Sequence, residues 1–391
     1  MKITQVRHVS APLASEIANA FISFMTMTTN VVAVETDAVR GGEKVIGYGF
    51  SSNGRYAQPG MLAERFVPRL MEADPKSLLD DTGENISPHA VWHTVMANEK
   101  PGGHGERSSC VGALDMAVWD IHAKLAERPL WNILSERYNA GNYDEKVLVY
   151  PGGGYYTPGK GLEKLQAEMS GYQEQGYKIC KMKVGAVPLP EDMKRIEAAI
   201  EILGAGANLA VDVNGRFDLK QAIEFGKAIL PLGLAWYEEP GDPLDYHLNA
   251  ELIRNYDGAI ATGENLFSHQ DMTNLLRFGG MRPDTDWLQP DPSLAYGLTE
   301  YLVILDEAEK LGWPRRRFLP HGGHQLALNM AAGLQLGGSE SYPGVFQPYG
   351  GFADDIPIVD GYATLPSDQP GIGMELKRKM MDEIRKQLEM D

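Results

Sequence analysis

Six ionisable residues recur along the second half of the chain at nearly even intervals. They are Lys183, Asp212, Glu238, Glu264, Asp291 and His321, separated by 29, 26, 26, 27 and 30 residues. Each of them stands at or just after the end of a short apolar segment that is typical of a β-strand. The interval is about the length of one strand, one helix and two loops, so the pattern predicts one site built from the ends of successive parallel strands.

Three of these residues are carboxylates at equivalent positions, in the segments LAVDVNG, WYEEP and ATGEN. Because side chains alternate along a strand, Asp212 shares a face with Ala210 and Asn214, while the valines between them face the other way. Most of the 53 acidic residues should be solvated surface groups. Three carboxylates at one rim instead repel each other unless a cation neutralises them, and oxygen ligands suit a hard divalent ion. We therefore predict a Mg²⁺ site at Asp212, Glu238 and Glu264.

The remaining residues of the series can transfer protons. Lys181 and Lys183 lie two residues apart and share one face of the predicted strand. Two ammonium groups side by side lower each other's pKa, which allows a lysine to act as a base near neutral pH. Asp291 can accept the Nδ1–H of His321 and so fix the imidazole tautomer. A KxK pair or a single histidine taken alone is more often structural. The prediction that these residues are catalytic therefore depends on their place in the series.

The elements that must position these residues change in type along the chain. The segment up to about residue 130 has an α+β pattern, in which two alternating strands precede a Gly-rich stretch, GYGFSSNGRYAQ, predicted as a surface loop. From about residue 146 strand and helix alternate, which predicts a β/α barrel. RRFLPHGG is the predicted seventh strand and the eighth lies near GGSESYP. An open doubly wound sheet is the alternative, but it gathers ligand residues at one switch point.

Composition excludes several classes of partner. The net charge of −17 opposes binding to nucleic acid, which needs a basic surface. No stretch approaches the ~20 apolar residues that span a bilayer, and the N-terminus lacks the apolar core of a signal peptide. The two cysteines, Cys110 and Cys180, are expected to be reduced thiols. We expect a cytoplasmic protein with no membrane partner.

These motifs together resemble one family from end to end of the chain. ALDMAVWDIHAK, KMK, DVNG, EEP, GEN, Asp291 and His321 follow the order and spacing of the mandelate racemase subgroup of the enolase superfamily. The resemblance implies an α+β capping domain over residues 1–130 and a modified (β/α)7β barrel over residues 131–365. It also implies that residues 366–391 return to the capping domain, that the cofactor is Mg²⁺, and that the chain forms a homo-oligomer.

At two positions this chain differs from some members of the subgroup, which limits the enzymes that it resembles. Muconate lactonizing enzymes carry a lysine where this chain has Asp291, and several sugar-acid dehydratases carry a histidine where it has Asn214. The remaining pattern is most similar to the D-tartrate dehydratase family, through segments such as NEKPGGHGER and YEEPGDPLDY. That resemblance implies that Lys100 reaches the substrate. Arg55, Asn214 and Glu340 are further substrate-binding candidates, with an ordinary surface arginine as the alternative for Arg55.

The resemblance implies a carbon–oxygen lyase acting on a small anionic substrate, a hydroxy-diacid or acid sugar. Lys183, with Lys181 beside it, would take the proton α to a carboxylate, and His321 would protonate the departing β-hydroxyl. The enol product would become a 2-keto acid, which is oxaloacetate if the substrate is tartrate. The same residues would suit a racemase or epimerase, or a dehydratase of another acid sugar. A non-catalytic protein that inherited the fold is the rival from another class, but it should have lost some of these residues. Loops at residues 17–28 and 51–58 would set substrate size.

Overall fold

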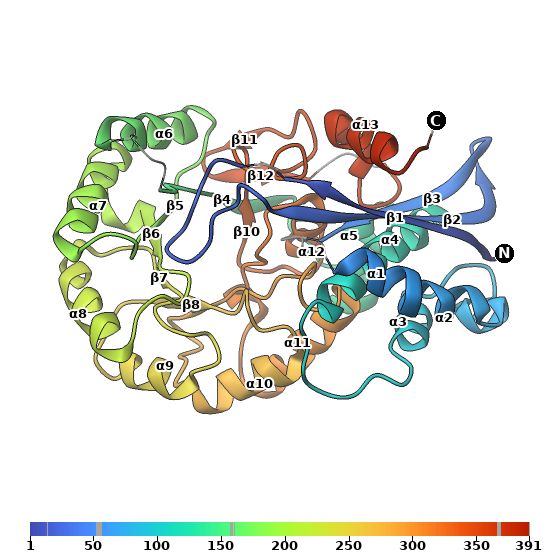
Figure 1. The fold of residues 1–391 in the computed structure, drawn as a ribbon, viewed down its shortest axis with the longest axis horizontal. Helices are drawn as coiled ribbons and strands as arrows, with labels where there is room; N and C mark the ends of the chain where they lie inside the picture. The colour runs from blue at the N-terminus through green and yellow to red at the C-terminus, as the bar shows by residue number, and fades with distance from the viewer. Residues whose placement is uncertain (14, 52–56, 157–158, 160, 366–368, 391) are drawn as a thin grey trace.

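A three-stranded antiparallel sheet begins the chain in the computed structural model, which describes residues 1–391 except 14, 52–56, 157–158, 160, 366–368 and 391. Its strands are β1 (Ile3–Pro12), β2 (Thr28–Arg40) and β3 (Glu43–Phe50), paired in the order β1-β2-β3. The long helix α4 (Arg107–Leu125) packs against β2 and β3. In Figure 1 the loop between β1 and β2 extends away from this sheet and over the mouth of the barrel.

The third strand corrects one prediction. Gly47 and Gly49, predicted to lie in a surface loop, are buried in β3. A Cβ atom on Gly47 would lie 2.0 Å from the carbonyl oxygen of Ala117, and one on Gly49 would lie 2.1 Å from that of Ala113. These two glycines therefore allow the strand to pack closely against α4, and they do not mark a turn. Residues 52–56 of the predicted loop lie outside the described residues, and its last residue, Gln58, begins helix α1.

Shorter helices complete this part of the chain. They are α1 (Gln58–Met61), a π-helical turn (Leu62–Phe66), α2 (Val67–Glu72), a 3₁₀ turn (Pro75–Leu78), α3 (Pro88–Val95) and α5 (Leu130–Tyr138). No helix among the described residues combines the length and the apolar character that crossing a bilayer requires.

Strands and helices then alternate around a barrel. The strands are β4 (Lys146–Gly153), β5 (Cys180–Lys183), β6 (Leu209–Asp212), β7 (Tyr237–Glu238), β8 (Ile260–Thr262), β9 (Trp287–Leu288) and β10 (Ser339–Ser341). The helices between them are α6 (Leu162–Glu174), α7 (Leu189–Leu203), α8 (Leu219–Ile229), α9 (Tyr246–Ile253), α10 (His269–Phe278), α11 (Leu298–Lys310) and α12 (Gln325–Gly333). Figure 1 shows α6 to α11 as an outer ring around the strands.

Local signals fix where these elements start and which way they face. Helix α8 begins at a capping box, in which the Asp218 side chain accepts a 2.8 Å hydrogen bond from the backbone N–H of Gln221. Val211, on β6, and Val213, just after the strand, belong to the main apolar core of the molecule. Ala210 belongs instead to a separate small cluster. The predicted alternation is therefore confirmed, and it places Asp212 on the same face as Ala210.

The seventh predicted strand is reduced to a single parallel bridge between Leu288 and Phe318. Pro320 has no N–H to donate, which limits the ladder here. Hydrogen bonds still follow the path of a strand. The N–H of Leu319 donates to Leu288 O at 2.8 Å, and the N–H of Glu340 donates to Pro320 O at 3.3 Å. Because β10 pairs with β4 in parallel, the hydrogen-bonded segments return to the first strand of the barrel.

The last part of the chain contacts both halves of the molecule. The hairpin β11 (Ile358–Val359) and β12 (Tyr362–Thr364) pairs with β4, and α13 (Arg378–Gln387) follows a 3₁₀ turn at Met374–Leu376. The carboxylate of Glu375 lies 2.5 Å from Nζ of Lys124 on α4, and the Asp120 side chain accepts from the N–H of Ile372 at 2.9 Å. The predicted domain boundaries, at residues 130 and 365, stay predictions.

A buried histidine of α4 makes stability depend on pH. His122 is fully buried, and its Nδ1 lies 2.8 Å from the carbonyl oxygen of Ile86, so Nδ1 carries the proton. Burial lowers the pKa of His122 from 6.5 to about 4. The unfolded chain therefore binds a proton that the folded chain does not, and stability is lost as the pH falls below 6.5. We expect His122 to contribute about 2 kcal/mol to the loss of unfolding free energy between pH 7 and pH 5.

Urea titrations at the two pH values measure this loss. His122→Asn keeps a donor for Ile86 O but cannot become charged. The loss of unfolding free energy between pH 7 and pH 5 should therefore be smaller in this variant by about 2 kcal/mol. Equal pH dependence in the variant and the natural chain would contradict the assignment to His122.

Candidate active site

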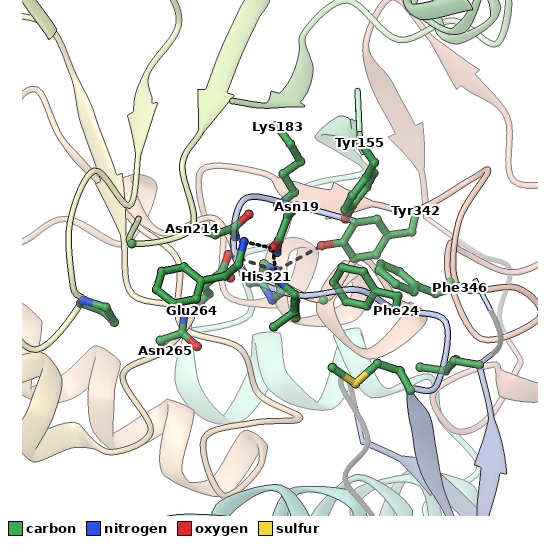
Figure 2. A pocket seen from close by; sticks show the side chains of 18 of the residues that line it. Asn19, Phe24, Tyr155, Lys183, Asn214, Glu264, Asn265, His321, Tyr342 and Phe346 are labelled. Atoms are coloured by element: carbon green, nitrogen blue, oxygen red, sulfur yellow. Dashed lines mark hydrogen bonds and ion pairs between the residues drawn. The ribbon is translucent and has the colours of Figure 1, made fainter. Parts of the chain in front are cut away.

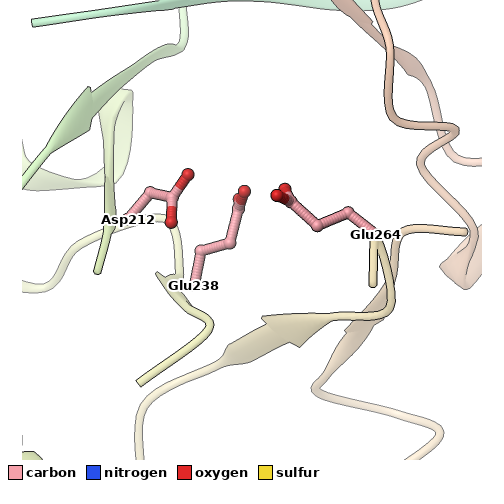
Figure 3. Close-up of side chains that lie close together, drawn as sticks. All are labelled: Asp212, Glu238 and Glu264. Atoms are coloured by element: carbon pink, nitrogen blue, oxygen red, sulfur yellow. The ribbon is translucent and has the colours of Figure 1, made fainter. Parts of the chain in front are cut away.

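The three predicted metal ligands converge at the ends of neighbouring strands. Asp212 ends β6, Glu238 ends β7, and Glu264 follows β8 by two residues. One carboxylate oxygen of each lies within 4.8 Å of the others, and all three residues are buried. Figure 3 shows the three carboxylates turned toward one another.

The chemistry of this cluster fits a hard divalent cation. Burial and the neighbouring carboxylates of Asp212, Glu264 and Glu340 raise the pKa of Glu238 to about 8, although Lys181 opposes them. The Oε2 atom of Glu264 is buried and makes no hydrogen bond, although it forms an ion pair with Nε2 of His321 at 3.2 Å. Carboxylates crowded in this way gain from an ion that takes one oxygen of each, as Mg²⁺ does.

The two lysines of β5 enter the same cluster. Lys183 pairs with Asp212, and Lys181 pairs with Glu238 and lies 2.8 Å from Glu340. Burial lowers the pKa of Lys183 and Lys181 lowers it further, as predicted. Asp212, Tyr155 and Glu264 together outweigh them, so the net shift of the Lys183 pKa is upward. In this structure Lys183 is therefore an ammonium group, so the sequence-based prediction of a lowered pKa is wrong for the site as it stands.

His321 and Asp291 form the predicted dyad. Nδ1 of His321 lies 2.8 Å from Oδ2 of Asp291, and Ser293 donates to the other oxygen of Asp291 from its N–H and its hydroxyl, each at 2.7 Å. Burial lowers the pKa of His321, but Glu264, Glu340 and Asp291 raise it to a net value of about 10. The imidazole is therefore protonated at neutral pH, the form that a general acid requires.

Glu340, on β10, lies between Lys181 and His321. It is fully buried, and its Oε2 lies 3.4 Å from Nε2 of His321 while Oε1 pairs with Lys181. The N–H of Gly322 donates to Oε2 at 3.3 Å. Glu340 thus spans the site between Lys181 and His321.

A cavity of about 440 Å³ opens onto Lys183, Glu264 and His321. Asn214 lines it, and its backbone N–H donates to Asp212 at 2.8 Å, so this predicted substrate residue also orients a metal ligand. The β1–β2 loop closes the cavity from the capping side through Asn19, Phe21, Ile22, Phe24 and Met27. Figure 2 shows Asn19 and Phe24 beside the barrel residues. The loop at residues 17–28, predicted to set substrate size, therefore reaches the site.

The structure does not bring Lys100 to this cavity. Its side chain is exposed, and its carbonyl oxygen accepts a 2.9 Å hydrogen bond from Arg107, which also pairs with Glu99 at 3.0 Å. These bonds tie the Lys100 backbone to the N-terminal end of α4, and Lys100 is not among the residues that line the cavity. A contact of Lys100 with substrate therefore stays a prediction. Arg55 lies outside the described residues.

Tyr155 and Tyr342 were missed by the analysis of the sequence. The ring of Tyr155 lies 5.3 Å from Nζ of Lys183, and the hydroxyl of Tyr342 lies 3.1 Å from Nε2 of His321. Tyr342 follows Glu340 by two residues, so the alternation that identified Asn214 beside Asp212 could have found it. No comparable spacing marks Tyr155.

Comparison with known proteins agrees with this fold. Residues 2–135 match the mandelate racemase/muconate lactonizing enzyme N-terminal domain, and residues 164–380 match the enolase C-terminal domain-like family. The chain belongs to the mandelate racemase/muconate lactonizing enzyme family of the enolase superfamily. The predicted class of fold, a barrel with an α+β capping domain, is thereby confirmed.

Named relatives include several dehydratases. The arabinonate dehydratase of Saccharolobus solfataricus is 30% identical over 79% of this chain and 81% of its own length. The L-talarate/galactarate dehydratase of Salmonella typhimurium is 28% identical over 94% of this chain and 87% of its own length. These names confirm the predicted enzyme class, a carbon–oxygen lyase.

Solved structures add the cofactor. A racemase from Streptomyces coelicolor with bound magnesium is 25% identical and superposes with a TM-score of 0.79 over 98% of this chain and 99% of its own. L-talarate dehydratase from Polaromonas sp., solved with Mg and L-glucarate, is 27% identical with a TM-score of 0.74 over 97% of each chain. With the buried Asp212, Glu238 and Glu264 cluster, they confirm Mg²⁺ as the cofactor.

Proposed function

We propose that this enzyme is a Mg²⁺-dependent dehydratase of acid sugars or hydroxy-diacids, with D-tartrate as its specific substrate. The observation that carries the proposal is the placement of the two proton-transfer groups. Lys183 contacts the first carboxylate of the metal cluster, Asp212, and His321 contacts the third, Glu264, at 3.2 Å. The two groups therefore flank the place where the cluster would hold a substrate carboxylate, and both open onto one cavity.

Each step of the reaction then has a residue in place. Asp212, Glu238 and Glu264 would hold Mg²⁺, whose positive charge would stabilise an enediolate anion and would compete with Lys183 for the carboxylate of Asp212. Lys183, once neutral, takes the proton from the α-carbon. The electron pair of that C–H bond forms the double bond and expels the β-hydroxyl, to which His321 gives its Nε2 proton to form water. Asp291 stabilises the imidazolium before transfer. The enol product becomes a 2-keto acid.

The choice of D-tartrate depends on the resemblance of the loops, since the relatives compared above act on other acid sugars. A panel test with Mg²⁺ decides it: D-tartrate, L-tartrate, meso-tartrate, arabinonate and galactarate, assayed for 2-keto acid. We expect oxaloacetate from D-tartrate at a kcat/KM at least tenfold above that of the other acids. Exchange of the α-proton with deuterium from the solvent, without loss of water, would support a racemase instead. Turnover of a longer acid in preference to tartrate would correct the substrate and retain the dehydratase.

The predicted surroundings of the enzyme are part of this proposal. Cys110 and Cys180 are both buried and free, which suits the reducing cytoplasm. Cytoplasmic location can be tested by cell fractionation, and the predicted homo-oligomer by light scattering of the purified chain.

A further inference from the structure

Tyr342 has a contact that the reaction described above does not use. Its hydroxyl lies 3.1 Å from Nε2 of His321, the nitrogen that would give its proton to the leaving group. The ring lines the cavity, and only 5% of the residue is exposed. Figure 2 shows the phenol of Tyr342 directed at the imidazole of His321.

Glycines enclose the ring and fix its direction. A Cβ atom on Gly152 would lie 2.7 Å from Cε1 of Tyr342, and one on Gly323 would lie 2.7 Å from Cδ2. The edge of the ring also packs on Phe346, with 5.1 Å between ring centroids. Backbone on two sides and an aromatic ring on a third leave the phenol little freedom to turn away from His321.

The hydroxyl differs chemically from the other groups at Nε2. Glu264 and Glu340 also face this nitrogen, at 3.2 and 3.4 Å, and as carboxylates they can only accept a hydrogen bond. The hydroxyl of Tyr342 can accept from the protonated nitrogen and can donate to it once the proton has left. Of these three groups, it alone suits both states of His321.

We propose that Tyr342 is a positioning residue for His321, which keeps Nε2 aimed at the β-hydroxyl before and after the proton transfer. Asp291 holds Nδ1 on the opposite side of the ring at 2.8 Å, so the imidazole is held at both nitrogens. The role of Tyr342 in proton transfer rests on the proposed dehydration. The hydrogen bond between Tyr342 and His321 can be tested without turnover.

The kinetic test uses Tyr342→Phe, which removes the hydroxyl and keeps the enclosed ring. In D₂O with Mg²⁺ and D-tartrate, NMR follows deuterium exchange at the α-carbon and formation of 2-keto acid together. A hydrogen bond to a charged group is worth enough to lower the elimination rate by ~10–100-fold. Exchange depends on Lys183, so the ratio of exchange to elimination should rise by the same factor. An unchanged ratio, whether both rates hold or both fall, overturns the proposal.

Tyr177→Phe is the matched control. The Tyr177 hydroxyl is buried and bonds to the hydroxyl of Ser341 at 2.9 Å, one residue before Tyr342, but Tyr177 does not line the cavity. Removing it should leave the ratio of exchange to elimination within about twofold of the natural enzyme.

A second measurement decides the inference even if D-tartrate is not a substrate. In protein labelled with ¹⁵N-histidine, the Nε2 resonance of His321 is assigned by its loss in His321→Asn. This resonance should move in Tyr342→Phe and stay in place in Tyr177→Phe. No movement in Tyr342→Phe refutes the contact. Absence of turnover in the natural enzyme with movement of the resonance refutes the proposed substrate alone.

Discussion

Replacement of Lys183 by methionine should lower both the exchange of the substrate α-proton and the formation of 2-keto acid by ~10³–10⁴-fold. Methionine keeps the length of the side chain and removes the amine, so the variant lacks the base that starts the reaction. Replacement of His321 by asparagine should slow elimination to a similar degree but leave exchange, because Lys183 still removes the α-proton. Stopped reactions in D₂O, with NMR for exchange and a keto-acid assay for elimination, measure the two rates.

The contrast between these variants is the decisive part of the experiment. Lys178→Met provides the control. Lys178 is exposed and does not line the cavity. Its Nζ lies 3.4 Å from the carboxylate of Asp360, which is in the turn of the hairpin beside β4. It should keep both rates. Exchange at the natural rate in Lys183→Met would show that another group is the base. Loss of exchange in His321→Asn would show that His321 also acts on the α-proton, as the racemase alternative requires.

The second large effect concerns the metal cluster. Glu238→Gln removes one of three carboxylate ligands, and kcat/KM with Mg²⁺ should fall by at least ~10³-fold, about 4 kcal/mol of transition-state stabilisation. Binding of an ion to the folded chain alone also stabilises it, by about 2.7 kcal/mol at a concentration of 100 times Kd. Mg²⁺ should therefore raise the melting temperature of the natural chain and leave that of Glu238→Gln unchanged.

The neighbouring residue offers a close control. Glu239 is also buried, but both of its oxygens accept from the amide of Asn265, at 2.9 and 3.0 Å, and it is not part of the carboxylate cluster. Glu239→Gln should therefore keep the stabilisation by Mg²⁺, as differential scanning calorimetry can show. If both variants retain the Mg²⁺ effect, the ion binds elsewhere and the assigned ligands are wrong.

Much of the barrel could be predicted because its rule is local. Alternation along β6 separates Val211 from Asp212 in any sequence that forms a strand, and the even intervals between charged residues indicate how many units meet. The same rule placed the seventh strand correctly but overestimated its hydrogen bonding. A proline near the end of this strand leaves one bridge where a ladder was expected. It failed at β3, because a glycine needed for contact with a distant helix looks like a glycine needed for a turn.

The state of the site could not be predicted in the same way. The pKa of Lys183 depends on the balance between burial, Lys181 and Asp212, and the distances that decide it exist only after three strands have come together. The same holds for Lys100, whose neighbours in the sequence suggested substrate binding. Its position is set by Arg107, seven residues further along the chain, which bonds to the Lys100 carbonyl oxygen.

The sequence by itself therefore determined which residues lie at the ends of the strands, because side-chain direction and repeat length are properties of the local chain. Only the tertiary structure decided how those residues act on one another. It paired Lys183 with Asp212, joined Glu340 to both Lys181 and His321, and set the hydroxyl of Tyr342 against His321. Such contacts depend on distances of a few ångströms between strands far apart in the chain, which no spacing along the sequence specifies.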